Sequence, residues 1–385
     1  MSTARGALDG LLVADFSRIL AGPYATMLLA DLGAEVIKVE SPGGDDTRTW
    51  MPPARDGEST YYLGVNRNKR AIALDLAQDE DLGAARELVA RADVVIENFK
   101  PGGLRRFGLD YETVSAANPR LIYASITGFG TGAGAALPGY DLLVQAASGL
   151  MSLTGDPAGP PYRTGISVFD LMTGMHAAIG VLAALEHRHT TGRGQHVEVN
   201  LLSSALSGLV NHTSGYVAGG VVPRRMGNAH PSLFPYEPLP TADKDLIVIA
   251  GNNGQFRRLC AELGLPELVG DERFTSNEAR TANREQLRPL LVAKLKERPA
   301  DEWFSRLSAA GVPCGPINHV DGGVALAREL GLEPVVDVGS GERAVPMIRN
   351  PITFSDSAIR HELPPPGLDE HGAAIRAWLR GEART

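Results

Sequence analysis

The chain has 385 residues, of which 43% are hydrophobic and 21% charged, a composition that supports a sizeable core and excludes an intrinsically disordered protein. Its formal net charge of −8 argues against nucleic acid as a partner, because nucleic-acid-binding proteins need an excess of Lys and Arg. The two cysteines, Cys260 and Cys314, cannot make a disulfide framework and lie in no zinc-ligand pattern, so we expect a cytoplasmic protein without a metal site.

The first part of the chain alternates apolar strands with helices. Strands over Leu11–Phe16 and Glu35–Glu40 flank a helix over Tyr24–Leu32, and a βαβ unit of this kind implies a parallel sheet. The alternation continues with a strand, a helix and two more strands, over Ala71–Leu76, Asp79–Ala92, Asp93–Phe99 and Leu121–Gly128. The pattern predicts a doubly wound, Rossmann-like α/β domain.

The second part begins with a long apolar helix over Asp170–His189, followed by a strand over His196–Leu201 and a helix over Ser203–Ala218. The apolar stretch that contains this helix carries Asp170 and His176, which a membrane helix rarely holds, so we expect no membrane partner. Beyond a Pro- and Gly-rich linker, the pattern suggests a smaller α+β unit. We therefore assign residues 1–222 and 326–385 to a large domain and residues 223–325 to a small domain with its linkers.

Several familiar site signatures are absent. The chain contains no GxGxxG, GxxxxGK[ST], HExxH or GxSxG pattern, which disfavours an NAD-dependent dehydrogenase, a P-loop enzyme, a zinc protease and a serine hydrolase.

Asp170 stands between a Gly- and Ser-containing loop and the long helix, and two interpretations are open. A helix N-terminus stabilises an anion and would keep a catalytic carboxylate ionised, but an N-cap is a commoner role for aspartate. Asn98 and Phe99 end a strand at the edge where open α/β sheets bind ligands, and the alternative is an ordinary strand end. Tyr140 follows a Gly-rich loop and could equally be a half-buried loop tyrosine.

Several long motifs, in one order over nearly the whole chain, resemble the family III CoA-transferases. They include DFSRILAGPYATMLLADLGAEVIKVESPGGDDTR, NRNKRAIALDL, ADVVIENFKPGGLRRFGL, PGYDLLVQAASGL, TGRGQHVEVNLL and GVPCGPIN. The resemblance implies that Asp170 is a catalytic nucleophile that passes through mixed-anhydride and aspartyl-CoA intermediates. Racemases of the family carry a histidine where this chain has Tyr140, and an ordinary tyrosine is a poor base at neutral pH. That difference favours CoA transfer.

The resemblance also implies a set of CoA contacts. By position these are Leu20, Ala21, Ser41, Leu74, Asp75, Leu76, Ala77, Asn98, Phe99, Lys100 and Arg106. Tyr140 is expected in the substrate pocket, together with Gly251, Gly254 and Gln255 of a glycine loop that covers the active site in relatives.

The function implied is CoA transfer from an acyl-CoA, most similar to the succinyl-CoA branch, to a small carboxylic acid. Coenzyme A then acts as a substrate, and no permanently bound cofactor is expected. Family members form interlocked homodimers, so self-association is expected here. Two alternatives stay open: an acyl-CoA racemase or epimerase, and a non-catalytic protein that binds CoA esters.

Overall fold

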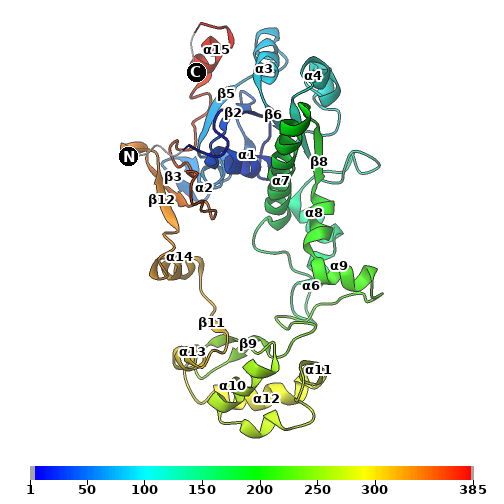
Figure 1. Ribbon diagram of the computed structural model, residues 1–385, viewed down its shortest axis with the longest axis vertical. Helices are drawn as coiled ribbons and strands as arrows, with labels where there is room; N and C mark the ends of the chain where they lie inside the picture. Colours follow the sequence, from blue (N-terminus) through cyan, green and yellow to red (C-terminus); the bar gives the residue numbers. More distant parts are fainter. Residues whose placement is uncertain (1–4, 383–385) are drawn as a thin grey trace. The chain divides into compact units, whose positions relative to one another are not determined.

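The computed structural model describes residues 5–382, and the chain divides into two compact units (Figure 1). Unit 1 comprises the described parts of Met1–Leu150, Arg163–Val222 and Glu333–Thr385, and unit 2 comprises Met151–Tyr162 and Pro223–Leu332. The segment 151–162, expected within the large domain, groups with unit 2 because Arg225 donates hydrogen bonds to the carbonyls of Asp156 and Gly159.

Unit 1 is built on a six-stranded sheet with the order β5-β2-β1-β6-β7-β8, and every strand pair in it is parallel. The strands are β1 (Leu12–Asp15), β2 (Glu35–Glu40), β5 (Lys69–Ala73), β6 (Val94–Glu97), β7 (Ile122–Thr127) and β8 (His196–Asn200). The predicted α/β class with a parallel sheet is confirmed. The order reverses between β1 and β6, and such a reversal is where doubly wound sheets bind ligands at the carboxyl ends of their strands.

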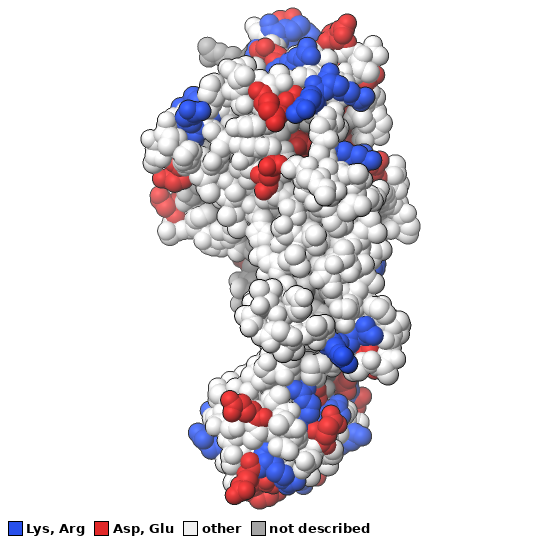
Figure 2. Space-filling view, turned by 90° about the vertical axis from the view of Figure 1, so that its right-hand side faces the viewer, with Lys and Arg blue, Asp and Glu red and all other residues white. Residues whose placement is uncertain are grey.

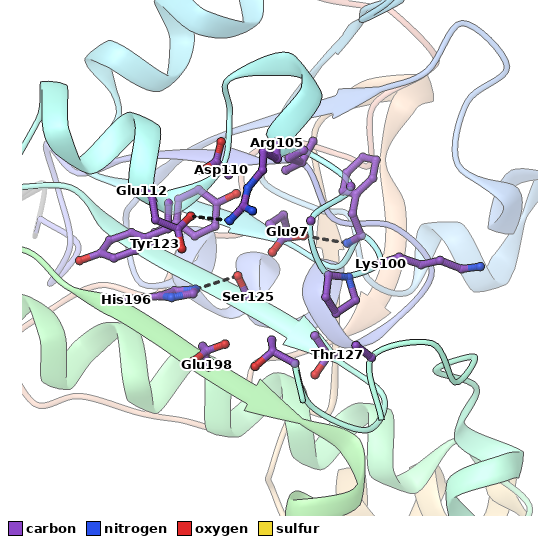
Figure 3. A pocket seen from close by; sticks show the side chains of 18 residues that line it. Glu97, Lys100, Arg105, Asp110, Glu112, Tyr123, Ser125, Thr127, His196 and Glu198 are labelled. Atoms are coloured by element: carbon purple, nitrogen blue, oxygen red, sulfur yellow. Dashed lines mark hydrogen bonds and ion pairs between the residues drawn. The ribbon is translucent and has the colours of Figure 1, made fainter. Parts of the chain in front are cut away.

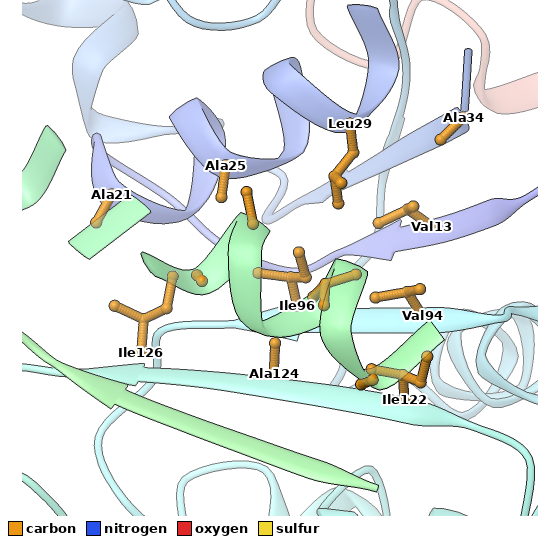
Figure 4. Packing of buried hydrophobic residues seen from close by; sticks show 14 of the residues in the cluster. Val13, Ala21, Ala25, Leu29, Ala34, Val94, Ile96, Ile122, Ala124 and Ile126 are labelled. Carbon is orange, nitrogen blue, oxygen red and sulfur yellow. The ribbon is translucent and has the colours of Figure 1, made fainter. Parts of the chain in front are cut away.

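Helices cover both faces of this sheet. On one face α1 (Ala21–Asp31) and α7 (Val168–Thr191) pack over alternate strand residues such as Val13, Ile96 and Ala124 (Figure 4). On the other face lie α3 (Asp79–Arg91), α4 (Tyr111–Ala117) and α15 (Gly372–Leu379). α7 is long and apolar enough to cross a membrane by composition alone, but its buried residues are part of this core.

Two helices differ from their predicted extents. α1 begins at Ala21, three residues earlier than expected, so that Gly22 and Pro23 lie in its first turn, where proline is tolerated. The single helix expected over Ser203–Ala218 is two helices, α8 (Leu201–Gly208) and α9 (Val210–Val217). The break falls at Val210, whose φ of 32° no regular α-helix contains.

Unit 2 has a three-stranded antiparallel sheet with the order β11-β10-β9, packed against helices. Its elements are β9 (Tyr236–Pro240), β10 (Asp245–Ile249), α10 (Asn253–Leu263), α11 (Asn277–Ala282), α12 (Arg284–Leu295), α13 (Ala300–Ala309), β11 (Cys314–Pro316) and α14 (Val320–Glu329). The remaining elements are β3 (Ala54–Arg55), β4 (Glu58–Ser59), α2 (Thr60–Leu63), α5 (Asp141–Ala147), α6 (Leu150–Leu153), β12 (Val335–Val338) and β13 (Val345–Ile348).

Candidate active site

The chain segments that leave β1 and β6 are joined at the point where the strand order reverses. The backbone N–H of Arg18 donates to Oδ1 of Asn98 at 3.0 Å, and Nδ2 of Asn98 donates to the Arg18 carbonyl at 2.7 Å. Leu20 and Ala21 follow directly, both buried, where α1 begins without a capping side chain. Residues expected from two separate segments to contact CoA therefore lie at the same edge of the sheet.

Buried ion pairs lie next to these segments. Nζ of Lys69 donates to Asp15 at 3.2 Å, and Nζ of Lys38 donates to Asp45 at 2.9 Å, with all four side chains at most 1% exposed. Burial lowers the pKa of Lys69 to about 8. Burial alone would raise the pKa of Asp15, but the ammonium groups of Lys69 and Lys38 hold it below its ordinary value. The four side chains are charge-paired, as buried ions need to be.

Asp170 lies in the first turn of α7, close to the start of α1. The N-cap of α7 is Ser167, so Asp170 is not the cap and that interpretation is wrong. One turn further on, Gly174 packs against α1: a Cβ placed on it would lie only 2.5 Å from the carbonyl oxygen of Ala21. The half-buried Asp170 carboxylate is thus one helical turn from the contact with Ala21.

The electrostatics at Asp170 differ from the expected effect of a helix N-terminus. The backbone N–H groups of Phe169 and Asp170 donate to Oδ1 of the buried Asp141, at 2.8 and 3.2 Å. The start of α7 therefore stabilises the charge of Asp141. Burial, with a further contribution from the Asp141 charge, raises the pKa of Asp170 to about 7. The expectation that the helix keeps Asp170 fully ionised is wrong for this reason.

Two tyrosines flank this pair of carboxylates. Tyr140 is the N-cap residue of α5, directly before Asp141, and its side chain is 67% exposed. Tyr61 of α2 lies against Ser167 and near Asp170, and burial followed by the neighbouring carboxylates raises its pKa. Asp141 and Tyr61 were not among the residues expected at this site, although an aspartate directly after a loop tyrosine at a helix start is a recognisable N-terminal signal.

The residues expected near the adenosine follow β2 and β5 on the same sheet edge. Ser41 is exposed directly after β2, and its hydroxyl donates to the Gly44 carbonyl at 3.3 Å. Leu74 is buried and Leu76 half-buried, while Oδ1 of Asp75 accepts from the N–H of the exposed Ala77 at 3.0 Å. Residues 74–77 therefore form a turn between β5 and α3 at the carboxyl end of β5.

Phe99, Lys100 and Arg106 continue the segment after β6. Phe99 is half-buried, while Lys100 is exposed. The guanidinium of the exposed Arg106 lies 4.4 Å from the ring centroid of Phe107. Within residues 5–382, no carboxylate forms an ion pair with Lys100 or Arg106. Both cations are therefore available to an anionic ligand.

Gly251, Gly254 and Gln255 belong to unit 2, whereas Asp170 belongs to unit 1. Gly251 precedes α10, but Gly254 and Gln255 lie in the first turn of that helix and not in a loop. Asn252 caps the turn, since its Oδ1 accepts from the backbone N–H of Gln255 at 2.9 Å.

A cavity of about 560 Å³ lies between the segment after β6 and the side chains of β7 and β8 (Figure 3). Its lining residues on β7 and β8 were not among those expected at the site. The hydroxyl of Ser125 and Nε2 of His196 are 2.9 Å apart there, and the ring of Tyr111 stacks on that of His196. Burial lowers the pKa of His196 and raises that of Glu97. The alternation of polar side chains along β7 and β8 was the available sequence signal.

No group of three or more His, Cys, Asp or Glu side chains suited to hold a metal ion occurs within residues 5–382. Doubly wound sheets bind nucleotide-bearing ligands where the strand order reverses, which here is between β1 and β6. The half-buried carboxylate of Asp170 lies near the start of α1, which follows β1. These features together fit an enzyme that presents a nucleotide-bearing substrate to a reactive carboxylate.

Comparison with known proteins identifies the family. The model of CoA-transferase family III matches residues 8–372, so the chain belongs to this family and is a CoA-transferase. The succinate–glutarate CoA-transferase of Agrobacterium fabrum is 43% identical, covering 100% of this chain and 98% of the relative. The acetyl-CoA:oxalate CoA-transferase of Acetobacter aceti is 42% identical, covering 97% and 95%. A crystal structure of a CAIB/BAIF family protein from Brucella suis, 46% identical, superposes with a TM-score of 0.87 over 97% of this chain and 100% of that chain.

Proposed function

We propose that the protein moves CoA from succinyl-CoA to a dicarboxylic acid, and that Asp170 is the nucleophile. The observation that carries the proposal is the position of Asp170. Its carboxylate is half-buried in the first turn of α7 and receives no hydrogen bond from residues 5–382. A carboxylate without donors is more nucleophilic than one whose lone pairs are occupied, and the neighbouring Asp141 already holds the helix N–H groups.

The reaction proceeds by exchange between oxygen and sulfur at acyl carbons. An oxygen of Asp170 attacks the thioester carbonyl of the donor. The C–S bond then breaks, CoA leaves as a thiolate, and a mixed anhydride of Asp170 and the donor acid remains. The thiolate then attacks the aspartyl carbonyl, which releases the donor acid and leaves an aspartyl-CoA thioester. The acceptor carboxylate repeats the two steps in reverse and regenerates Asp170. The free energy of the donor thioester is retained in the anhydride and aspartyl-CoA intermediates and passes to the product thioester, so no ATP is consumed.

The CoA moiety is proposed to lie along the carboxyl edge of the sheet. The adenosine would lie near Ser41 and the turn 74–77, the pantetheine arm would pass Asn98 and Phe99, and the thioester would reach Asp170 beside Ala21. Arg106 and Lys100 would neutralise phosphate groups, because both are exposed cations that have no carboxylate partner in the described part of the chain. The bare N-terminus of α1 adds a positive dipole at the same edge.

We further propose that the protein self-associates as a homodimer. The sequence from Leu201 to Val222 contains no charged residue, and Figure 2 shows that the side of unit 1 over α8 and α9 is largely free of charged side chains. Exposed apolar side chains there include Val210 at 64% and Val217 at 82%. An apolar surface of this kind is typical of a protein–protein interface. Sedimentation equilibrium checks the proposal, and a monomer at micromolar concentration contradicts it.

The function is tested by an acceptor screen with succinyl-CoA as donor. Glutarate, mesaconate, citramalate and oxalate are offered as dicarboxylic acceptors, with butyrate as a control that has a single carboxylate. We expect a new acyl-CoA, detected by liquid chromatography and mass spectrometry, with at least one dicarboxylate and little or none with butyrate. Transfer from acetyl-CoA but not from succinyl-CoA would contradict the proposed donor.

A further inference from the structure

We propose that Asp45 is a positioning residue of the CoA site, because its buried carboxylate holds Ile19 in the left-handed conformation from which Leu20 and Ala21 enter α1. This inference rests on the proposed CoA contacts of Leu20, Ala21 and Ser41. Nothing in the reaction itself requires Asp45, which lies in the segment between β2 and α2.

Ile19 has an unusual backbone conformation. Its φ is 70°, in the left-handed region, where a β-branched side chain is disfavoured by contact with the backbone. Residues held in this region are found where the surrounding structure imposes the conformation, often at functional sites. Ile19 directly precedes Leu20, the N-cap residue of α1, so its conformation sets the direction in which the chain enters the helix.

The contacts of Asp45 provide that constraint. Its two carboxylate oxygens accept from the backbone N–H of Ile19 at 3.3 and 3.2 Å. The same carboxylate accepts from Thr47, from the backbone N–H at 3.0 Å and from the hydroxyl at 2.8 Å. Lys38 completes the set with an ion pair at 2.9 Å. Asp45 is 3% exposed, so water does not compete for these bonds.

Asp45 is itself fixed from both sides. Its backbone N–H donates to Oε2 of Glu40 at 2.8 Å, and Glu40 is paired with Arg48 at 2.7 Å. Nζ of Lys38 also donates to the Ser17 carbonyl at 3.0 Å. The carboxylate therefore connects the segment after β1 with the segment after β2, which carry Ala21 and Ser41. A change at Asp45 would alter the separation of two segments on which CoA is proposed to lie, without touching Asp170.

The test is a set of variants assayed for steady-state transfer and for equilibrium binding of CoA. Asp45→Asn keeps the size and one acceptor but removes the charge opposite Lys38. We expect it to raise the KM for acyl-CoA and the dissociation constant of CoA about tenfold, with kcat within about twofold, because the reacting groups stay in place. Asp46→Asn is the matched control: Asp46 is the next residue, exposed, and within residues 5–382 its carboxylate forms an ion pair only with Arg18, so removal of its charge should change neither constant.

A rescue experiment separates positioning from general destabilisation. Glycine adopts a positive φ readily, so adding Ile19→Gly to Asp45→Asn should recover most of the lost affinity although it removes further side-chain contacts. Asp45→Ser, which keeps a hydroxyl acceptor, replaces Asp45→Asn if the latter does not fold. A lower melting temperature with unchanged KM and CoA affinity, or a double variant that binds more weakly than Asp45→Asn, overturns the proposal. If the wild type binds CoA but transfers none, the proposed function is contradicted. The CoA dissociation constants of the variants then still test the role of Asp45.

Discussion

Asn98 and Arg18, which lie 80 residues apart in the sequence, exchange two hydrogen bonds between the side-chain amide of one and the backbone of the other. A side-chain amide both donates and accepts at once, whereas an ionised carboxylate of the same size has no donor. It joins the carboxyl ends of β1 and β6, where the strand order reverses. Asn98 thus fixes the two segments to each other at the point where CoA is proposed to bind.

Replacement of Asn98 should weaken CoA binding through this junction. In Asn98→Asp the bond to the Arg18 carbonyl is lost and two acceptors face each other, so we expect a destabilisation of about 1–3 kcal/mol and a higher KM for acyl-CoA. Urea unfolding and steady-state kinetics measure the two effects. Asn118→Asp is a suitable control, since Asn118 lies in a distant turn after α4. Wild-type stability and KM in Asn98→Asp would contradict the structural role.

The pH dependence of transfer should report Asp170. Its pKa is raised to about 7, so the ionised fraction of the nucleophile declines below neutral pH, and kcat/KM should fall about tenfold per pH unit on the acid side of 7. Burial is the larger cause and the Asp141 charge the smaller. Asp141→Asn keeps an oxygen for the N–H groups of Phe169 and Asp170, and should move the acid limb toward lower pH by about one unit. An unmoved limb in this variant would show that another group controls the profile.

The same shift has a consequence for stability. Ionisation of Asp170 is less favourable in the folded protein than in the unfolded chain, because the folded-state pKa lies above the ordinary value of 3.8. The stability contributed by the protonated form is complete below the ordinary pKa of 3.8 and is lost as the pH rises from there to about 7. Asp170→Asn should therefore raise the free energy of unfolding at pH 8 by about 1–2 kcal/mol and change it little at pH 4. Urea unfolding at the two pH values checks this, and an equal effect at both would contradict it.

Arg106 should contribute a phosphate contact. Arg106→Ala removes an exposed cation that stacks on Phe107, so we expect the KM for acyl-CoA to rise about tenfold, as for one charge-assisted contact, without loss of stability. Arg105→Ala is the matched control, because the neighbouring Arg105 is directed to Glu112 at 3.7 Å. Equal KM values for the two variants would remove Arg106 from the CoA site.

Tyr140 should not support racemisation. Incubation with a chiral 2-methylacyl-CoA in D₂O should give no deuterium at the α-carbon, since a phenol is a poor general base compared with the histidine that racemases use. Mass spectrometry of the recovered thioester measures the exchange. Steady uptake that is lost in Tyr140→Phe would favour the racemase alternative.

Much of unit 1 follows from local patterns in the sequence. The central strands β1 and β6 are short, mostly apolar runs, and the start of α7 was predicted to within two residues because an apolar stripe begins there. The break at Val210 was not predicted, because no proline lies between α8 and α9 and the change in backbone conformation separates them.

The site was predictable as a set of positions but not in its electrostatics. Asp170 could be identified from the motifs around it, whereas its raised pKa depends first on burial and then on Asp141, which is 29 residues away and reaches α7 only in the folded chain. Ile19 and Asp45 are 26 residues apart, and no local pattern marks a left-handed isoleucine. Contacts of this kind arise from tertiary packing and leave no periodic signal in the sequence.

The most direct test of the account is to trap the covalent intermediate on Asp170. The wild-type protein is incubated with succinyl-CoA, treated with hydroxylamine or borohydride, digested, and analysed by mass spectrometry, with Asp170→Asn treated in parallel. The account predicts a mass change on the peptide that contains Asp170, and a variant that folds but loses at least about 10³-fold in transfer. Trapping at another carboxylate, or an Asp170→Asn protein that retains full transfer, would contradict it.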